Sequence, residues 1–317
     1  MRSAVLTGPG SIELVEGVAA AVRPGEVRVE VEGCGVCGSN VPVWEGRPWF
    51  SYPLPPGNPG HEAWGRVAEV GEEVGALGVG QRVAVLSDDA FRDELVVPAS
   101  RLVPLPPELD GDPFPGEALG CAFNAARRSD LRAGQTVAVV GVGFLGSLLV
   151  GLAAETGARV IAIGRKEAAL ETARSMGAAE TVLMDDHDRV IQEVSRLTRG
   201  AFCERVVEAA GASWPLDLAG ELTGFGGRLV IAGFHQDGLR QVNVQLWNWR
   251  GIDVANAHER DPEMALRGIR AAVESVASGR LDPRPLYTHV FPLDELKAAM
   301  DEAAARPAGF VKALVTA

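Results

Sequence analysis

Three short segments of the chain hold residue types that can bind a metal or a nucleotide. Residues 33–40 read Gly-Cys-Gly-Val-Cys-Gly-Ser-Asn, residues 60–65 read Gly-His-Glu-Ala-Trp-Gly, and residues 141–146 read Gly-Val-Gly-Phe-Leu-Gly. Thiolate and imidazole are ligands that suit zinc. A glycine-rich turn that opens a helix lets backbone N–H groups face phosphate. The chemistry of each segment therefore depends on the elements that position it.

The glycine turn lies between an expected strand, Thr136–Val140, and an expected helix, Leu145–Glu155. This strand–turn–helix context is the one that a dinucleotide-binding fingerprint requires. Gly141 would allow a tight turn, Gly143 would let the backbone approach the pyrophosphate, and Gly146 would let the helix pack closely on the strand. A packing turn without a ligand is the alternative. We predict a dinucleotide site at Gly141, Gly143, Phe144, Leu145 and Gly146.

The end of the next expected strand, Arg159–Ile163, indicates which dinucleotide is preferred. In NAD sites an Asp or Glu about 20 residues after the glycine turn accepts a hydrogen bond from the ribose 2′-hydroxyl. This chain instead continues with Gly164, Arg165 and Lys166. A glycine leaves room for a 2′-phosphate, and the two cations can pair with it. The pattern favours NADP(H) over NAD(H), although both cations could simply be solvated charges in the first turn of a helix.

The bulk composition excludes several other classes of function. The formal net charge is −12, which disfavours nucleic acid and anionic membrane as partners. The four cysteines are too few and too scattered for a disulfide framework, so we expect reduced thiols and a cytoplasmic protein. The N-terminus lacks the apolar run of a secretory signal. Residues 137–154 carry no charge, but their glycines and change of period indicate a buried strand followed by a helix.

The order of expected elements changes near Glu117. Before it, short valine-rich strands separated by glycine and proline predict a compact β unit, with strands over 26–31, 66–70, 82–86 and 94–97. After it, strands alternate with helices, which predicts a doubly wound parallel sheet. Its further expected strands span 205–208, 228–232 and 252–255, and its further helices 166–176 and 212–222. Two helices, over 263–278 and 293–305, and a strand over 310–315 complete the chain.

A cysteine followed by Gly-Ser, then Gly-His-Glu, then Gly-x-Gly-x-x-Gly, in this order, resembles the zinc-dependent medium-chain dehydrogenases, which include alcohol, sorbitol and threonine dehydrogenases. The resemblance covers essentially the whole chain. It implies an α/β protein with a GroES-like, β-rich catalytic domain over 1–121, completed by 257–317, and a Rossmann cofactor domain over 122–256. It also implies a homodimer or homotetramer that acts on a small alcohol or carbonyl compound.

Carried over by position, the resemblance makes Cys37 and His61 zinc ligands. Cys121 is the first choice for the third ligand, with Glu62 and Glu117 as alternates; a catalytic zinc keeps its fourth position open. Many family members also carry a lobe with four closely spaced cysteines that binds a structural zinc. Here residues 82–86 run almost directly to 91–98 without a cysteine, so we expect one zinc in each chain. Cys34 and Cys203 are expected to be small buried side chains.

The implied reaction is hydride transfer between an alcohol carbon and the nicotinamide, with zinc polarising the substrate oxygen. The expected catalytic residues are Cys37, Ser39, His61 and Glu62. Ser39 resembles the family's proton-accepting hydroxyl, although it could merely cap a helix. Two departures bear on this chemistry. Asn40 replaces an aspartate that buttresses the ligand histidine; its neutral amide can still accept that hydrogen bond but makes the imidazole less basic. Pro42 replaces a histidine that passes protons to solvent in several relatives.

The remaining expectations concern the cofactor's nicotinamide end and the substrate. Ala232, Gly233 and Val254 match strand ends that contact the carboxamide, and Lys312 matches a basic residue at the pyrophosphate, though it could be a solvated lysine. Polar groups that could face a pocket favour a polyol, such as a sugar alcohol or cyclitol: Glu45, Arg47, Asn256 and His258. Four aromatic residues could wall the pocket or belong to the core: Trp44, Trp49, Phe50 and Trp64. Surface or structural roles are expected for His187, His235 and His289.

The leading hypothesis is a zinc-dependent, NADP-linked alcohol or polyol dehydrogenase. One alternative is a zinc-free quinone or enone reductase of the same superfamily, which would not need Cys37, His61 and Cys121 together. The other is a nucleotide-binding protein without catalytic activity, which Asn40 and Pro42 keep open.

Overall fold

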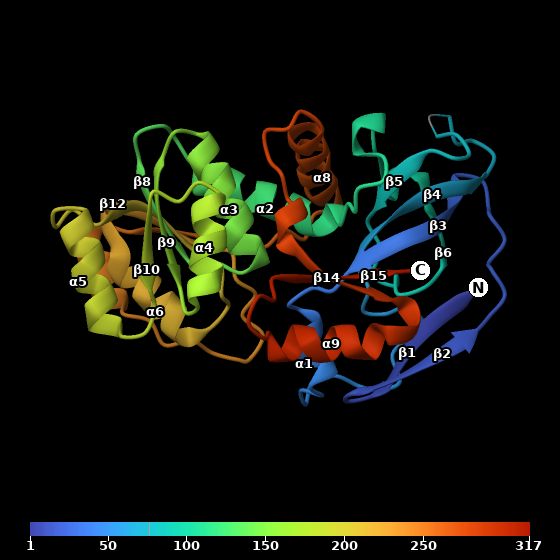
Figure 1. The fold of residues 1–317 in the computed structure, drawn as a ribbon, viewed down its shortest axis with the longest axis horizontal. Coiled ribbons are helices and arrows are strands. Elements are labelled where there is room, and N and C mark those ends of the chain that lie inside the picture. Colours follow the sequence, from blue (N-terminus) through green and yellow to red (C-terminus); the bar gives the residue numbers. More distant parts are fainter. Residues whose placement is uncertain (76) are drawn as a thin grey trace. The chain divides into compact units, whose positions relative to one another are not determined.

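A computed structural model describes residues 1–75 and 77–317. The chain divides into two compact units (Figure 1). Unit 1 contains Met1–Gly120 and Ala265–Ala317, and unit 2 contains Cys121–Met264. Unit 1 is built mainly from antiparallel strands, whereas unit 2 alternates strands with helices. The chain thus has the predicted α/β fold class, with a β-rich unit and a parallel-sheet unit.

Unit 2 contains a six-stranded, fully parallel sheet in the order β10-β9-β8-β11-β12-β13. Numbered along the chain from β8, this is the 3-2-1-4-5-6 order of a dinucleotide-binding sheet. Its chain order reverses between β8 and β11, the place where such sheets bind ligands. The strands are β8 (Thr136–Val140), β9 (Arg159–Gly164), β10 (Glu180–Leu183), β11 (Cys203–Glu208), β12 (Thr223–Ile231) and β13 (Asp253–Asn256).

Helices cover both faces of this sheet because its strands are apolar on both sides. Val137 and Val139 pack with α3 (Phe144–Glu155) and α4 (Glu167–Ser175). Ala138 and Val140, which point the other way, pack with α5 (His187–Leu197) and α6 (Ser213–Leu222). A shorter helix, α7 (Val244–Arg250), precedes β13. Figure 1 shows the two groups of helices on opposite sides of the strands.

Two glycines of the turn after β8 are required by close backbone contacts. Gly141 has a φ of +94°, and a Cβ there would lie 2.8 Å from the Cβ of Ala210. A Cβ at Gly146 would lie 1.9 Å from the carbonyl oxygen of Gly141, because α3 starts directly against the end of β8. The tight turn and the close helix packing expected from the sequence are therefore both present.

Unit 1 contains a seven-stranded sheet that combines the two ends of the chain. Its order is β14-β15-β3-β4-β5-β7, and β6 pairs with β3. The strands are β3 (Glu26–Gly35), β4 (Glu62–Val70), β5 (Arg82–Val85), β6 (Glu94–Pro98), β7 (Leu102–Pro104), β14 (Tyr287–Pro292) and β15 (Lys312–Thr316). A separate two-stranded sheet pairs β1 (Arg2–Gly8) with β2 (Ser11–Glu16). The helices are α1 (Asn40–Trp44) and α9 (Leu296–Ala305).

Two further helices cross the division between the units along the chain: α2 (Gly116–Ser129) and α8 (Pro262–Ala277). Most predicted strands and helices occur within a few residues of the expected bounds. The structure adds elements that the sequence did not indicate, including the β1–β2 pair, β10, α5, α7 and β14. β10 is an edge strand with one buried residue, Val182, so it lacks the apolar run that marks the inner strands. None of the described helices is long and apolar enough to cross a membrane.

The contact between Gly146 and Gly141 generates a stability prediction. Replacing Gly146 with valine should lower the free energy of unfolding by about 2 kcal/mol or more, because the new side chain has to displace backbone. The matched control is Gly143→Ala, where a Cβ would meet nothing within 4 Å. We expect that control to change stability by less than about 0.5 kcal/mol in urea denaturation. Equal stability of the two variants would contradict the packing argument.

Candidate metal centre and dinucleotide site

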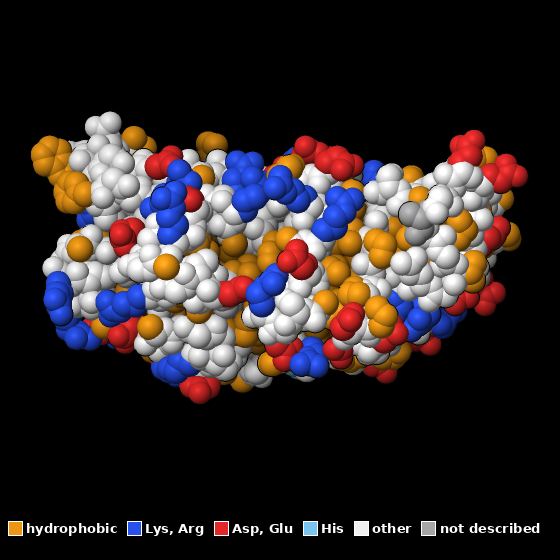
Figure 2. Space-filling model, turned by 90° about the horizontal axis from the view of Figure 1, so that it is seen from above, with side chains coloured by type: hydrophobic (Ala, Val, Ile, Leu, Met, Phe, Trp, Pro, Cys, Tyr) orange, Lys and Arg blue, Asp and Glu red, His pale blue; other side chains and the backbone are white. Residues whose placement is uncertain are grey.

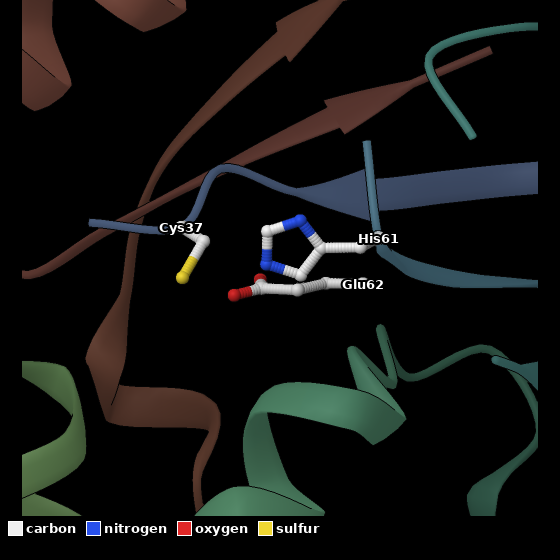
Figure 3. A group of neighbouring side chains, drawn as sticks. All are labelled: Cys37, His61 and Glu62. Carbon is white, nitrogen blue, oxygen red and sulfur yellow. The ribbon is translucent and has the colours of Figure 1, made fainter. Parts of the chain in front are cut away.

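Cys37, His61 and Glu62 form a cluster of potential metal ligands in unit 1. Their ligand atoms all lie within 4.8 Å of one another, and Figure 3 shows the thiol, the outer edge of the imidazole and the carboxylate converging. Strand pairing brings them together. Cys37 follows the end of β3, His61 precedes the start of β4, and Gly35 of β3 pairs with Glu62 of β4.

A hydrogen bond determines which nitrogen of His61 faces the cluster. Nδ1 lies 2.8 Å from the carbonyl oxygen of Pro59. A carbonyl can only accept, so Nδ1 carries a proton, and in the neutral imidazole Nε2 keeps its lone pair. The Nε2 edge is the one that points toward the thiol of Cys37. This tautomer, fixed by a backbone carbonyl, is the arrangement that a metal-binding histidine requires.

The role expected for Asn40 has to be corrected. Its amide does not accept a hydrogen bond from His61. Instead, Oδ1 accepts from the backbone N–H of Cys37 at 2.9 Å, and Nδ2 donates to the carbonyl of Pro59 at 3.1 Å. Asn40 thus ties the cysteine segment to the carbonyl that orients His61. An ionised aspartate could not donate that second hydrogen bond, so the amide suits this geometry.

The charges around the cluster favour a protonated imidazole when no cation is bound. Burial lowers the pKa of His61, but the thiol of Cys37 and the carboxylates of Glu117 and Glu62 raise it, and the net result lies well above the usual value. An environment that attracts a proton this strongly also attracts a metal cation, since both are positive charges that bind the same lone pair.

Glu62 is held by a buried ion pair with Lys312. The lysine Nζ donates to Oε1 at 2.7 Å, and both side chains are almost inaccessible to solvent. The pair fits because Gly35 has no side chain: a Cβ there would lie 1.9 Å from Glu62 Oε2. Lys312 is therefore not a solvated lysine. Its ammonium donates to Glu62. The contact with the pyrophosphate that the sequence predicts for Lys312 stays a prediction.

The two other candidate ligands lie on α2. Glu117 is half-buried in the first turn, and its charge raises the pKa of both His61 and Lys312. Cys121 lies one turn later, is exposed, and belongs to unit 2. Ser39 precedes α1, and its side chain makes no capping hydrogen bond, which removes the capping explanation for this hydroxyl.

Other residues singled out from the sequence divide into core and surface. Trp44 and Trp64 are buried, and the Trp44 indole donates to Asp301 at 2.9 Å. Trp49 is 52% exposed and tilts against half-buried Phe50. Glu45 and Arg47 form an ion pair in which both side chains remain largely accessible. Both cysteines expected to be buried, Cys34 and Cys203, are buried, and burial raises the pKa of each thiol.

The dinucleotide turn of unit 2 has an open position where the sequence predicts a phosphate. Gly143 precedes α3, and a Cβ there would meet no protein atom within 4 Å. Protein packing therefore does not explain this glycine, whereas backbone approach to a ligand does. Gly164 is buried at the end of β9, where a Cβ would lie 2.5 Å from Val142. Arg165 and Lys166 follow it and are exposed.

The ends of β11 and β12 contain a group that sequence reasoning missed. Ala232 and Gly233 follow β12, and both of their N–H groups donate to the carbonyl of Glu208. Glu208 ends β11 and is fully buried. His235 lies 3.0 Å from its carboxylate, which agrees with the structural one of the two roles expected for this histidine. A glutamate directly after two valines, at the carboxyl end of an inner strand, was the available signal. Val254, in β13, is 38% exposed.

Two family models match the chain. Residues 23–107 match the alcohol dehydrogenase GroES-like domain, and residues 145–267 match the zinc-binding dehydrogenase domain. The two ranges fall in the β-rich and the parallel-sheet parts of the fold, in the order that the motifs predicted. The chain belongs to the zinc-type medium-chain dehydrogenase/reductase family.

Individual relatives agree with this assignment. The chain is 28% identical to a 2-dehydro-3-deoxy-L-galactonate 5-dehydrogenase from Pseudoalteromonas atlantica, over 99% of this chain and 98% of the relative. It superposes with a TM-score of 0.87 on 2R,3R-butanediol dehydrogenase from Bacillus subtilis, at 25% identity and coverage of 100% and 99%. A Sinorhizobium meliloti 1021 protein described as a zinc-binding dehydrogenase, bound to NADP, gives 0.85 at 26% identity and the same coverage. Dehydrogenase relatives support an alcohol or polyol oxidoreductase.

The buried ion pair generates the second prediction. Lys312→Met should lower the free energy of unfolding by about 3–5 kcal/mol, because it leaves the buried Glu62 carboxylate without its ion-pair partner. Adding Glu62→Gln to that variant should restore part of the loss. The control is Lys297→Met, which breaks an exposed pair with Asp301 and should cost less than about 1 kcal/mol. Denaturant unfolding measures all three, and similar losses for both lysines would contradict the buried-pair argument.

Proposed function

We propose that this protein is a zinc-dependent oxidoreductase that transfers a hydride between NADP(H) and an alcohol or polyol, or the corresponding carbonyl compound. The observation that carries the proposal is the convergence of Cys37, His61 and Glu62 within 4.8 Å, with the proton of His61 fixed on Nδ1. Thiol, imidazole and carboxylate together are a donor set that fits zinc. A quinone or enone reductase without zinc has no need for this convergence.

The proposed metal ligands are Cys37 Sγ and His61 Nε2, with the third from Cys121 or from one of the carboxylates, Glu62 or Glu117. A zinc ion held there would supply a Lewis acid for the substrate oxygen. The chain's own contribution is to hold these ligands. Asn40 and Pro59 orient the thiol segment and the imidazole, and Lys312 neutralises Glu62.

Ser39 is the proposed acceptor of the alcohol proton. It lies two residues after Cys37, and its backbone N–H points to the Cys37 sulfur at 3.5 Å, so its position is tied to that of the ligand. A hydroxyl can accept a proton from the substrate only if it passes one on. Pro42 offers no ionisable group for that second transfer. Water or a cofactor hydroxyl is the proposed route.

The proposed cofactor site lies along the carboxyl ends of the unit 2 strands. The open position at Gly143 admits the pyrophosphate beside the start of α3. Gly164 leaves no carboxylate to repel a 2′-phosphate, and Arg165 and Lys166 are exposed cations next to it. Ala232, Gly233 and Val254 are proposed to meet the carboxamide. The NADP bound to the Sinorhizobium protein supports this cofactor, which supplies the hydride or accepts it.

A polyhydroxylated substrate is the proposed class. The Pseudoalteromonas relative is named for a sugar-derived substrate and the Bacillus structure for a diol. Unit 1 offers the accessible Glu45–Arg47 pair and the exposed ring of Trp49, a combination of hydrogen-bonding groups and an apolar surface that suits such compounds.

We also propose a cytoplasmic homodimer or homotetramer. A screen of alcohols, sugar alcohols and cyclitols with NADP, followed by the absorbance of the reduced nicotinamide, tests the substrate class.

Elemental analysis tests the metal. The purified protein should contain about one zinc per chain, and Cys37→Ala should lose both zinc and activity, because a thiolate ligand is removed. The control is Cys34→Ala, which removes a buried thiol only three residues away that is outside the cluster. It should keep the zinc. An active protein without metal would refute the zinc proposal and favour the quinone or enone reductase.

Cofactor preference is tested at Arg165. Arg165→Asp should weaken NADPH binding about tenfold or more, since it replaces a cation beside the 2′-phosphate with an anion, and should leave NADH binding unchanged or tighter. The control is Arg196→Asp in the last turn of α5, which exchanges a similarly exposed charge elsewhere in unit 2. Fluorescence titration gives both dissociation constants. If the two affinities fall together, Arg165 does not select the cofactor.

A further inference from the structure

A fully buried carboxylate lies at the carboxyl edge of the unit 2 sheet. Glu208 Oε1 accepts hydrogen bonds from the N–H groups of Ala210 at 2.8 Å and Gly211 at 2.7 Å. Its other oxygen lies 3.0 Å from His235 Nε2. An ionised carboxylate that is buried away from water needs several hydrogen-bond donors. The two backbone N–H groups and His235 supply them to Glu208.

The next hydrogen bond determines how the protons in this group are arranged. Arg240 Nε donates to His235 Nδ1 at 2.9 Å. Because an arginine can only donate, Nδ1 must carry a lone pair, and Nε2 carries the proton that it donates to Glu208. His235 is therefore a neutral bridge between a carboxylate and a guanidinium. Each of its ring nitrogens takes part in one hydrogen bond.

The network connects the segments to which the cofactor is assigned. Ala210 packs directly against Gly141 of the phosphate turn, since a Cβ at Gly141 would lie 2.8 Å from its methyl group. A Cβ at Gly233 would lie 2.2 Å from the amide nitrogen of Gly211 and 2.7 Å from Glu208 Oε2. The segment that follows β12 therefore packs closely against the Ala210–Gly211 loop, whose N–H groups donate to Glu208.

Residues 232–243 need such an anchor because they form no helix or strand. Their backbone contacts the sheet at Ala232 and Gly233, whereas Phe234 is 48% exposed and Leu239 fully exposed. Phe234 stacks on His258, which follows β13, with ring centroids 5.1 Å apart. His235 and Arg240 are the polar side chains that fasten this segment to the buried carboxylate.

We propose that Glu208, His235 and Arg240 form a positioning network that holds the Ala232–Gly233 turn in place for the nicotinamide end of the cofactor. This inference rests on the proposed function. A buried ionic network adds little net stability compared with apolar residues of similar volume, so stability alone does not account for it. Its position behind the predicted carboxamide contacts accounts for it directly. His235 is a positioning residue, acting through the backbone of Ala232 and Gly233.

Two ligands separate this role from a general structural one. NADPH carries the nicotinamide, whereas adenosine 2′,5′-bisphosphate carries only the adenosine end and the 2′-phosphate. His235→Phe keeps a ring but cannot bridge Glu208 and Arg240. We expect this variant to raise the dissociation constant of NADPH about tenfold, a change that corresponds to the loss of one to two hydrogen bonds. The dissociation constant of the bisphosphate should stay within about twofold of wild type.

The conservative variant is His235→Gln, whose amide can donate to Glu208 and accept from Arg240. It should bind NADPH within about threefold of wild type. If the phenylalanine variant does not fold, His235→Asn, which is too short to bridge both partners, is measured in the same way. Isothermal titration or fluorescence gives both constants, and thermal unfolding reports stability separately.

The inference is overturned if His235→Phe binds both ligands as the wild type does, if it loses affinity for both in equal proportion, or if His235→Gln is as defective as His235→Phe. A wild-type protein that binds neither NADPH nor NADH would refute the proposed function, and this inference with it. Normal wild-type binding with an insensitive variant would refute only the positioning role.

Discussion

The pairing of β3 with β4 is the constraint on which the candidate metal centre depends. It places Gly35 opposite Glu62, so that Cys37, just beyond one strand, meets His61, just before the other. A shift of one residue would turn Glu62 to the opposite face of the sheet, because side chains alternate along a strand. The absence of a side chain at Gly35 is part of the same constraint, since the Glu62 carboxylate fills that space.

The C-terminal strand completes this arrangement. β15 pairs with β3 and brings Lys312 to Glu62 across 250 positions of sequence. A carboxylate buried beside a thiol and an imidazole would be unfavourable without a cation. The final strand therefore supplies both a neighbour for β3 and the ion-pair partner of the buried Glu62 carboxylate. The candidate ligands depend on residues from both ends of the chain.

Unit 2 also contains a buried carboxylate, Glu208, whose charge needs partners. Its sheet collects loops at one edge, and Glu208 links the loop after β11 to the segment after β12. In both units a buried carboxylate lies next to the proposed chemistry, and in unit 2 it also holds irregular backbone. Irregular segments lack the repeating hydrogen bonds of helices and strands, so side chains have to supply their anchors. On the face drawn in Figure 2, basic side chains occur alongside acidic ones, although the net charge is −12.

The sequence by itself determined the features that depend on local pattern. The turn at Gly141–Gly146 could be predicted because its glycines are needed by the strand and helix on either side, and the family could be recognised from three motifs in order. Only the tertiary structure decided the partners of the charged groups: Pro59 rather than Asn40 on His61, Lys312 on Glu62, and His235 on Glu208. The physical reason is distance along the chain. Local geometry follows from neighbouring residues, whereas the partner of a buried charge follows from strand pairing and loop packing between distant segments.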